Sequence, residues 1–116
     1  MDSIKTKKII EKAIIAFDNS NAEDAFELLN RSLLEDSNSV DILNALGDLN
    51  YLSDNMIKAL DYWDKSLAIN YSQVDILFNT ALIYQQNNEH RKALDLYSRL
   101  GWIETYLEEL KLHFLF

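Results

Sequence analysis

Residues 58–61 read Lys-Ala-Leu-Asp, and residues 92–95, which lie 34 positions later, read Lys-Ala-Leu-Asp again. Residues 24–27, which lie 34 positions earlier, read Asp-Ala-Phe-Glu. A second string, Val-Asp-Ile-Leu at 40–43, also returns after 34 positions, at 74–77. A fixed period of this length is typical of stacked helix-turn-helix units. Such an array is a scaffold with an extended surface, so the period favours binding over catalysis.

Six segments carry apolar residues at helical spacing, and short polar breaks separate them. The breaks fall at 18–21, 36–39, 53–55, 70–72 and 85–88. Two glycines and no proline in 116 residues argue against a many-turned β fold. We therefore expect one all-α domain over 1–116, with neighbouring helices antiparallel because their connections are short. Asp2 or Ser3 should cap the first helix, and Ser72 the fifth.

The composition narrows the possible partners. The formal net charge of −8 makes nucleic acid an improbable ligand and an anionic membrane surface a repulsive one. No cysteine is present, so disulfides and thiolate metal sites are excluded. Charged residues interrupt the apolar run near the N-terminus, and no stretch has the length of a membrane span. We expect a cytoplasmic protein.

Catalytic groups are sparse. His90 stands at a predicted turn and His113 in an apolar tail, so the two histidines are far apart in a stacked array. Neither has a second ligand at metal-binding spacing, and no glycine-rich phosphate loop is present. The sequence predicts no enzyme activity, no metal site and no cofactor.

Small residues recur where paired helices would cross. The first helix of each unit carries a small residue, at Ala13, Gly47 and Ala81. The second helix carries Ala59 or Ala93, each followed four residues later by an aromatic residue, Trp63 or Tyr97. Ala25 with Leu29 is a looser match to this second pattern. This pattern resembles the tetratricopeptide repeat. The resemblance implies a right-handed superhelical α-solenoid of three repeats, at about 6–39, 40–73 and 74–107, with a C-terminal cap at about 103–116. Trp63 and Tyr97 would then fill the space between successive repeats.

The sequence departs from that family at several positions. Ser37 and Tyr71 replace the proline that usually follows the second helix, so we expect the fourth helix to continue more smoothly into the fifth. Lys12 and Asn50 replace residues that are typically apolar or aromatic. None of these changes breaks the period.

The resemblance also implies that the first helix of each repeat lines a concave face that binds peptides. Carried over by position, the groove comprises Lys7, Ile10, Glu11, Ile14, Phe17, Asp41, Asn44, Asp48, Tyr51, Asp75, Phe78, Asn79, Leu82 and Gln85. Acidic residues alternate there with apolar residues that we expect to be exposed, which favours a protein segment with apolar anchors and positive charge. Asp75 has the wrong sign for a carboxylate clamp of the kind that chaperone-binding relatives carry.

Two alternatives concern assembly. Trp102–Phe116 is too apolar for a fully solvated end, so it could cap the solenoid, fill the groove or dock on a second copy to form a homodimer. A structural self-assembly element would pair through Trp102–Phe116 and would bind nothing in the groove. A secretion or assembly chaperone would use the same groove for an aggregation-prone client. Gly101 either interrupts the sixth helix or is tolerated inside it.

Overall fold

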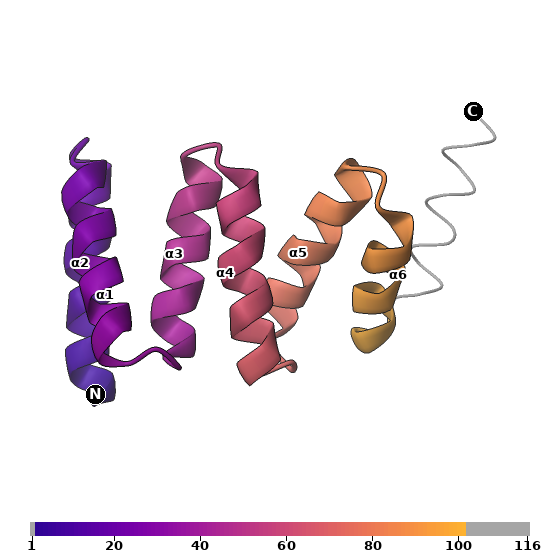
Figure 1. Cartoon of the computed structure of the whole chain (residues 1–116), viewed down its shortest axis with the longest axis horizontal. Helices are drawn as coiled ribbons and strands as arrows, with labels where there is room; N and C mark the ends of the chain where they lie inside the picture. Colours follow the sequence, from indigo (N-terminus) through magenta and orange to yellow (C-terminus); the bar gives the residue numbers. More distant parts are fainter. Residues whose placement is uncertain (1, 102–116) are drawn as a thin grey trace. The chain divides into compact units, whose positions relative to one another are not determined.

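The computed structural model describes residues 2–101, and these fall into two compact units that divide after Asn70. All regular structure in residues 2–101 is helical (Figure 1). The first unit contains α1 (Ser3–Asp18), α2 (Ala22–Glu35), α3 (Val40–Leu52) and α4 (Met56–Ile69). The second contains α5 (Val74–Gln86) and α6 (His90–Arg99). The predicted cap and apolar tail over 102–116 lie outside the described residues.

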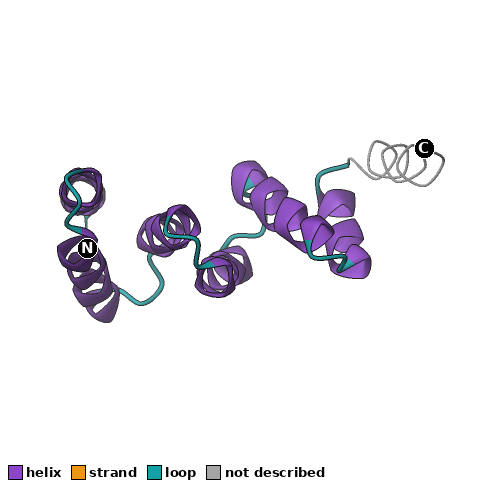
Figure 2. Ribbon diagram, turned by 90° about the horizontal axis from the view of Figure 1, so that it is seen from above, coloured by secondary structure: helices purple, strands orange, loops and turns teal. Residues whose placement is uncertain are grey.

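The six helices confirm the all-α prediction and follow the 34-residue period. In each unit, short connections place successive helices side by side, and the four helices of the first unit appear nearly end-on from above (Figure 2). The helices pack in consecutive pairs, α1 with α2, α3 with α4 and α5 with α6. Within the first unit, α3 also packs against both α1 and α2.

The turn inside each helix pair has the same hydrogen-bonded geometry. Ser20, Asp54 and Asn88 all have positive φ, at 64°, 62° and 62°. In the first pair, the Asn21 N–H donates to the Ala16 carbonyl at 2.8 Å and the Ser20 N–H to the Phe17 carbonyl at 3.1 Å, and both bonds recur at each later turn. This is a Schellman motif, which satisfies carbonyls at a helix end. The backbone therefore repeats with the period of the sequence.

The small residues lie where close packing requires them. The repeat alanines are fully buried: Ala13, Ala25, Ala59, Ala81 and Ala93 each have 0% exposure. Gly47 packs directly on the Trp63 ring, because a Cβ at this position would overlap Trp63 Nε1 and Cδ1. A side chain at the crossing would thus push α3 and α4 apart. These positions confirm the role that the sequence assigned to small residues.

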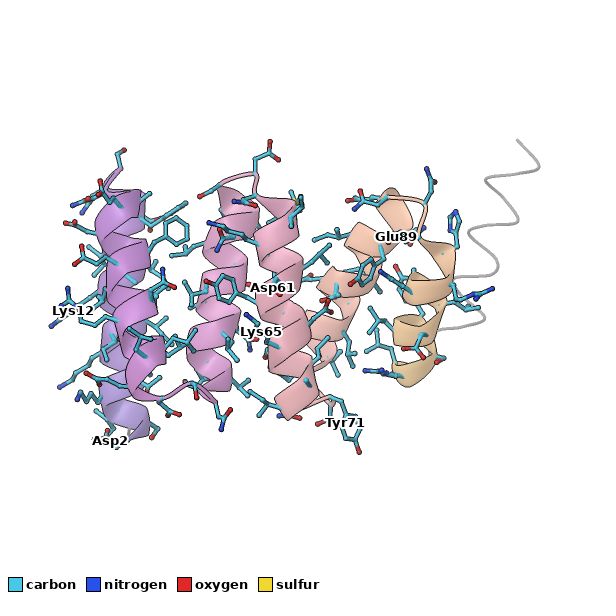
Figure 3. The ribbon with its side chains drawn as sticks, viewed as in Figure 1. Asp2, Lys12, Asp61, Lys65, Tyr71 and Glu89 are labelled. Carbon is cyan, nitrogen blue, oxygen red and sulfur yellow. The ribbon has the colours of Figure 1, made fainter. Side chains whose placement is uncertain are left out.

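The core of the first unit is built from one side of each helix. Its buried residues are Ala13, Ala25, Leu29, Ile42, Ala45, Leu46 and Leu49. Partly buried apolar side chains extend this cluster, and Phe17 and Phe26 meet edge to face there, with ring centroids 6.4 Å apart. The Tyr62 hydroxyl donates to Asn30 Oδ1 at 3.3 Å and ties α4 to α2. Lys12 is exposed on the outside of α1, so a charge is tolerated at this family position (Figure 3).

Two local predictions were wrong. Helix α4 does not run on towards α5 but ends at Ile69, because Asn70 adopts an extended conformation (φ −139°, ψ 99°). The N-cap of α5 is Gln73 rather than Ser72, and its side chain does not cap the helix. Asp2, by contrast, caps α1 as expected, with its carboxylate accepting from the Lys5 N–H at 2.8 Å. Helix α6 ends at Arg99, and Gly101 follows with φ 73°, which settles its role as an interruption.

Candidate binding cavity of the first unit

A cavity of about 600 Å³ opens between α1 and α3 in the first unit. Its lining consists of Ser3, Ile4, Lys7, Ile10, Glu11, Ala13, Ile14, Leu29, Asp41, Asn44, Ala45, Asp48 and Leu49. The volume is within the range of small-ligand pockets in proteins. Seven of the residues predicted for the groove therefore surround one space: Lys7, Ile10, Glu11, Ile14, Asp41, Asn44 and Asp48.

Helical geometry explains why these residues converge. Helix α1 contributes positions 7, 10, 11 and 14, and α3 contributes 41, 44, 45 and 48. Both sets follow the spacing i, i+3, i+4, i+7, which places side chains on one face of a helix. The two sets are also equivalent positions of successive repeats, 34 residues apart. The two walls of the cavity are thus formed by equivalent faces of α1 and α3.

The floor of the cavity is apolar and continuous with the core. Ala13 and Leu29 are fully buried, and Ala45 and Leu49 are nearly so. Ile10 packs against the same core cluster. Nearer the solvent, Ile14 is 43% exposed and Ile4 is 69% exposed. A guest could therefore remove apolar surface from water without disturbing the packing beneath it.

The polar lining carries an acidic excess, with Glu11, Asp41 and Asp48 against one lysine, Lys7. Asp41 lies in the first turn of α3, where the positive end of the helix dipole favours a carboxylate. Asp48 lies in the second half of the same helix and lacks that support. Burial raises the pKa of the Asp48 carboxyl above its ordinary value, and the Trp63 indole N–H partly opposes the rise.

Trp63 packs against α3 beside Asp48. Its side chain is 2% exposed and lies against Gly47 and Tyr51, with the two ring centroids of Tyr51 and Trp63 5.8 Å apart. Within the described residues, Trp63 Nε1 has no partner at full hydrogen-bonding geometry, and its effect on Asp48 is the smaller of the two influences on that carboxyl. These contacts lie within its own helix pair, and the packing of Trp63 between repeats stays a prediction.

The other predicted groove residues lie elsewhere. Phe17 is half-buried against Phe26 and is not the exposed anchor that we expected. Tyr51 is 42% exposed beside Trp63. The remaining five belong to α5 of the second unit: Asp75, Phe78, Asn79, Leu82 and Gln85. Among these, Asp75 and Phe78 are exposed, Asn79 and Leu82 are half-buried, and Gln85 Oε1 accepts a hydrogen bond from the Tyr97 hydroxyl at 2.8 Å.

Six lining residues are not among those predicted for the groove: the buried Ala13, Leu29, Ala45 and Leu49 of the floor, and Ser3 and Ile4 at the start of α1. Ile4 stands three residues before Lys7 and seven before Glu11, so the helical spacing that found the others also reaches it. The contact of Trp63 with Gly47, in contrast, joins two helices and has no signal in the spacing of either one.

No group of three or more histidine, cysteine, aspartate or glutamate side chains in residues 2–101 could hold a metal ion. None of the helices from α1 to α6 combines the length and apolar character needed to cross a bilayer.

Together, the repeated helix pairs, the alanine crossings and the recurring turns define a helical-repeat fold of the tetratricopeptide type. Two solved structures have the same architecture, and both are crystal structures of MamA, a tetratricopeptide-repeat protein. One superposes with a TM-score of 0.68 and the other with 0.69, each at 24% sequence identity over 86% of this chain.

The present chain covers 55% of one MamA chain and 58% of the other, so it spans a little over half of their length. No protein-family model matches the sequence, and no curated protein matches it. The similarity to MamA therefore shows the fold.

Proposed function

We propose that this chain is a non-catalytic protein-interaction module that binds a segment of a partner protein in the cavity between α1 and α3. The segment would carry apolar side chains and positive charge. Tetratricopeptide-like folds serve protein–protein interaction or assembly, and the neighbours of this chain have that fold. The proposal extends the coarse function of the fold to a particular surface.

One observation carries the proposal: the cavity combines an apolar floor with an acidic excess at its walls. Ile14 and Ile4 expose apolar surface there, and Leu29 and Ala45 close the base. Exposed apolar side chains bordered by charges are characteristic of peptide-binding surfaces. Three carboxylates against one lysine give the walls a net charge that attracts a basic segment and repels an acidic one.

A matched pair of variants on α1 tests the location. Ile14 lines the cavity, whereas its neighbour Ile15 is 60% exposed and lies outside the cavity lining. Random peptides displayed on phage would be selected on the full chain, and dissociation constants of enriched peptides measured by calorimetry. We expect Ile14→Lys to weaken binding at least about tenfold, because it introduces a like charge and removes an anchor, and Ile15→Lys to change it less than twofold.

Equal binding to the wild type and to Ile14→Lys would contradict the location. Failure of any peptide to enrich on the wild type would contradict peptide binding itself. The predicted homodimer through Trp102–Phe116 involves residues outside those described, and it makes a separate prediction. If that self-assembly reading were correct, sedimentation would show a dimer whose mass is unaffected by Ile14→Lys.

A further inference from the structure

We propose that Asp48 is the residue that selects a positively charged side chain of the bound segment. The cavity would accept one lysine or arginine at its Asp48 end and apolar side chains along the rest of its length. The inference rests on the proposed function, because it specifies the chemistry of the segment that the cavity binds. It separates Asp48 from Asp41 and Glu11, which share its charge but not its surroundings.

Two of the three carboxylates have a source of positive charge on their own helix, namely the dipole for Asp41 and the lysines of α1 for Glu11. Asp41 lies at the N-terminal turn of α3, near the positive end of the helix dipole, and Lys7 occupies the equivalent position on α1. Glu11 shares α1 with several lysines, of which Lys7 and Lys8 lie one turn before it. A guest cation would therefore compete at both sites with a charge that the protein already supplies.

Asp48 has no such compensation. Helix α3 contains no lysine or arginine, and its last turn, which carries the negative end of the dipole, holds no basic residue. None of Glu11, Asp41 and Asp48 forms an ion pair within the range 2–101, so Asp48 differs from the other two by its place on α3, away from the positive end of the dipole and from any basic residue of its helix. The carboxylate is exposed towards the cavity and has Trp63 at its back. A cation entering the cavity would therefore gain most at this end.

Packing beside Asp48 fixes the backbone from which its side chain projects. Its neighbour Gly47 lies directly against the Trp63 ring, which is 2% exposed and cannot move without disturbing the core. The backbone of α3 at residues 47–48 is consequently fixed relative to α4. A partly desolvated carboxylate on a fixed backbone discriminates between a charged and a neutral guest side chain better than a fully solvated carboxylate does.

A double-mutant cycle tests this assignment on the full chain. The probe is one enriched peptide with a single lysine or arginine, and a second version of the same peptide with glutamine at that position. Dissociation constants would be measured for both peptides on the wild type, Asp48→Asn and the matched control Asp41→Asn. We expect the basic peptide to lose at least about tenfold in affinity on Asp48→Asn, and the glutamine peptide to bind the wild type and Asp48→Asn equally. Asp41→Asn should retain most of the preference for the basic peptide.

The outcomes separate this inference from the proposed function. Enriched peptides that lack basic residues, or a charge preference that survives in Asp48→Asn, would overturn the assignment while leaving peptide binding intact. Failure of the wild type to enrich any peptide would overturn both. A loss of affinity caused by unfolding would weaken the glutamine peptide equally, and this result would also count against a direct role for Asp48.

Discussion

At the scale of single residues, close contacts between side chains and backbone decide where the helices can approach. Gly47 is a poor helix former in the middle of α3, yet it is the only residue type that fits beneath the Trp63 ring. At this position, the close crossing of α3 and α4 outweighs the lower helix propensity of glycine.

We expect Gly47→Ala to lower the free energy of unfolding by about 1–2 kcal/mol, because overpacking of the Trp63 contact outweighs the gain in helix propensity. Urea denaturation followed by circular dichroism would measure the change. In a Trp63→Phe background, the smaller ring relieves the overlap, and the same substitution should cost less. A Gly47→Ala protein as stable as the wild type would show that Trp63 can move aside.

Asp48 has a pKa that burial raises, so the folded state binds its proton more tightly than the unfolded state does. Its contribution to stability is present below the ordinary pKa of 3.8 and is lost as the pH rises through the raised value. We expect Asp48→Asn to become more stable relative to the wild type as the pH increases from 3 to 7. Thermal unfolding at a series of pH values would measure this difference.

The control variant for this prediction should change stability at neutral pH in the opposite direction. Asp41→Asn removes a carboxylate from the first turn of α3, so it should lower stability at pH 7 by about 0.3–1 kcal/mol. A gain in stability at neutral pH together with a loss of basic-peptide affinity would mark Asp48 as a binding residue, because a structural residue would lose both. A pH-independent difference between Asp48→Asn and the wild type would refute the linkage.

At the scale of secondary-structure elements, each of the three turns within helix pairs has a residue other than glycine at positive φ. Their left-handed residues are Ser20, Asp54 and Asn88, where glycine is the residue that most often ends a helix in this way. Asparagine and aspartate tolerate this conformation better than serine does. The turn between α1 and α2 should therefore be the most strained of the three.

Replacing Ser20 with glycine should raise the free energy of unfolding by about 0.5–1 kcal/mol, because glycine adopts positive φ without steric conflict. Asn19→Gly is the matched control, since Asn19 has φ −89° and no strain to relieve. It should leave stability unchanged or lower it. The idea fails if chemical denaturation gives the same midpoint for Ser20→Gly as for the wild type.

At the scale of the whole molecule, the first unit contains all the packing that forms the cavity. Every lining residue lies between Ser3 and Leu49, and α4 supplies Trp63 behind them. We expect a fragment of residues 1–70 to fold cooperatively and to bind an enriched peptide within about threefold of the full chain. Its melting temperature should be lower, because repeat arrays gain stability from each neighbouring unit.

Circular dichroism melting and calorimetric titration of the fragment would measure both quantities. A fragment that is helical but does not bind the peptide would place part of the binding surface in residues 71–116. A fragment without a cooperative transition would show that the first unit depends on the second.

The sequence determined the helices and their pairing. Its 34-residue period, the small residues at 13, 25, 47, 59, 81 and 93, and the polar breaks predicted all six helices and the buried crossings, because helical spacing and steric limits act locally along the chain. The same spacing brought seven predicted residues to one cavity. It misjudged the exposure of Phe17, since that ring packs against Phe26 on the adjacent helix.

Only the tertiary structure decided which carboxylate differs from the others. Asp41 and Asp48 have the same side chain and lie on the same face of α3, and nothing in the local sequence shows that Asp48 is the one that burial affects. They differ because burial partly desolvates Asp48, while the start of α3 supports Asp41. Burial depends on contacts between residues distant in sequence, so the electrostatic character of the cavity emerges only when the helices have packed.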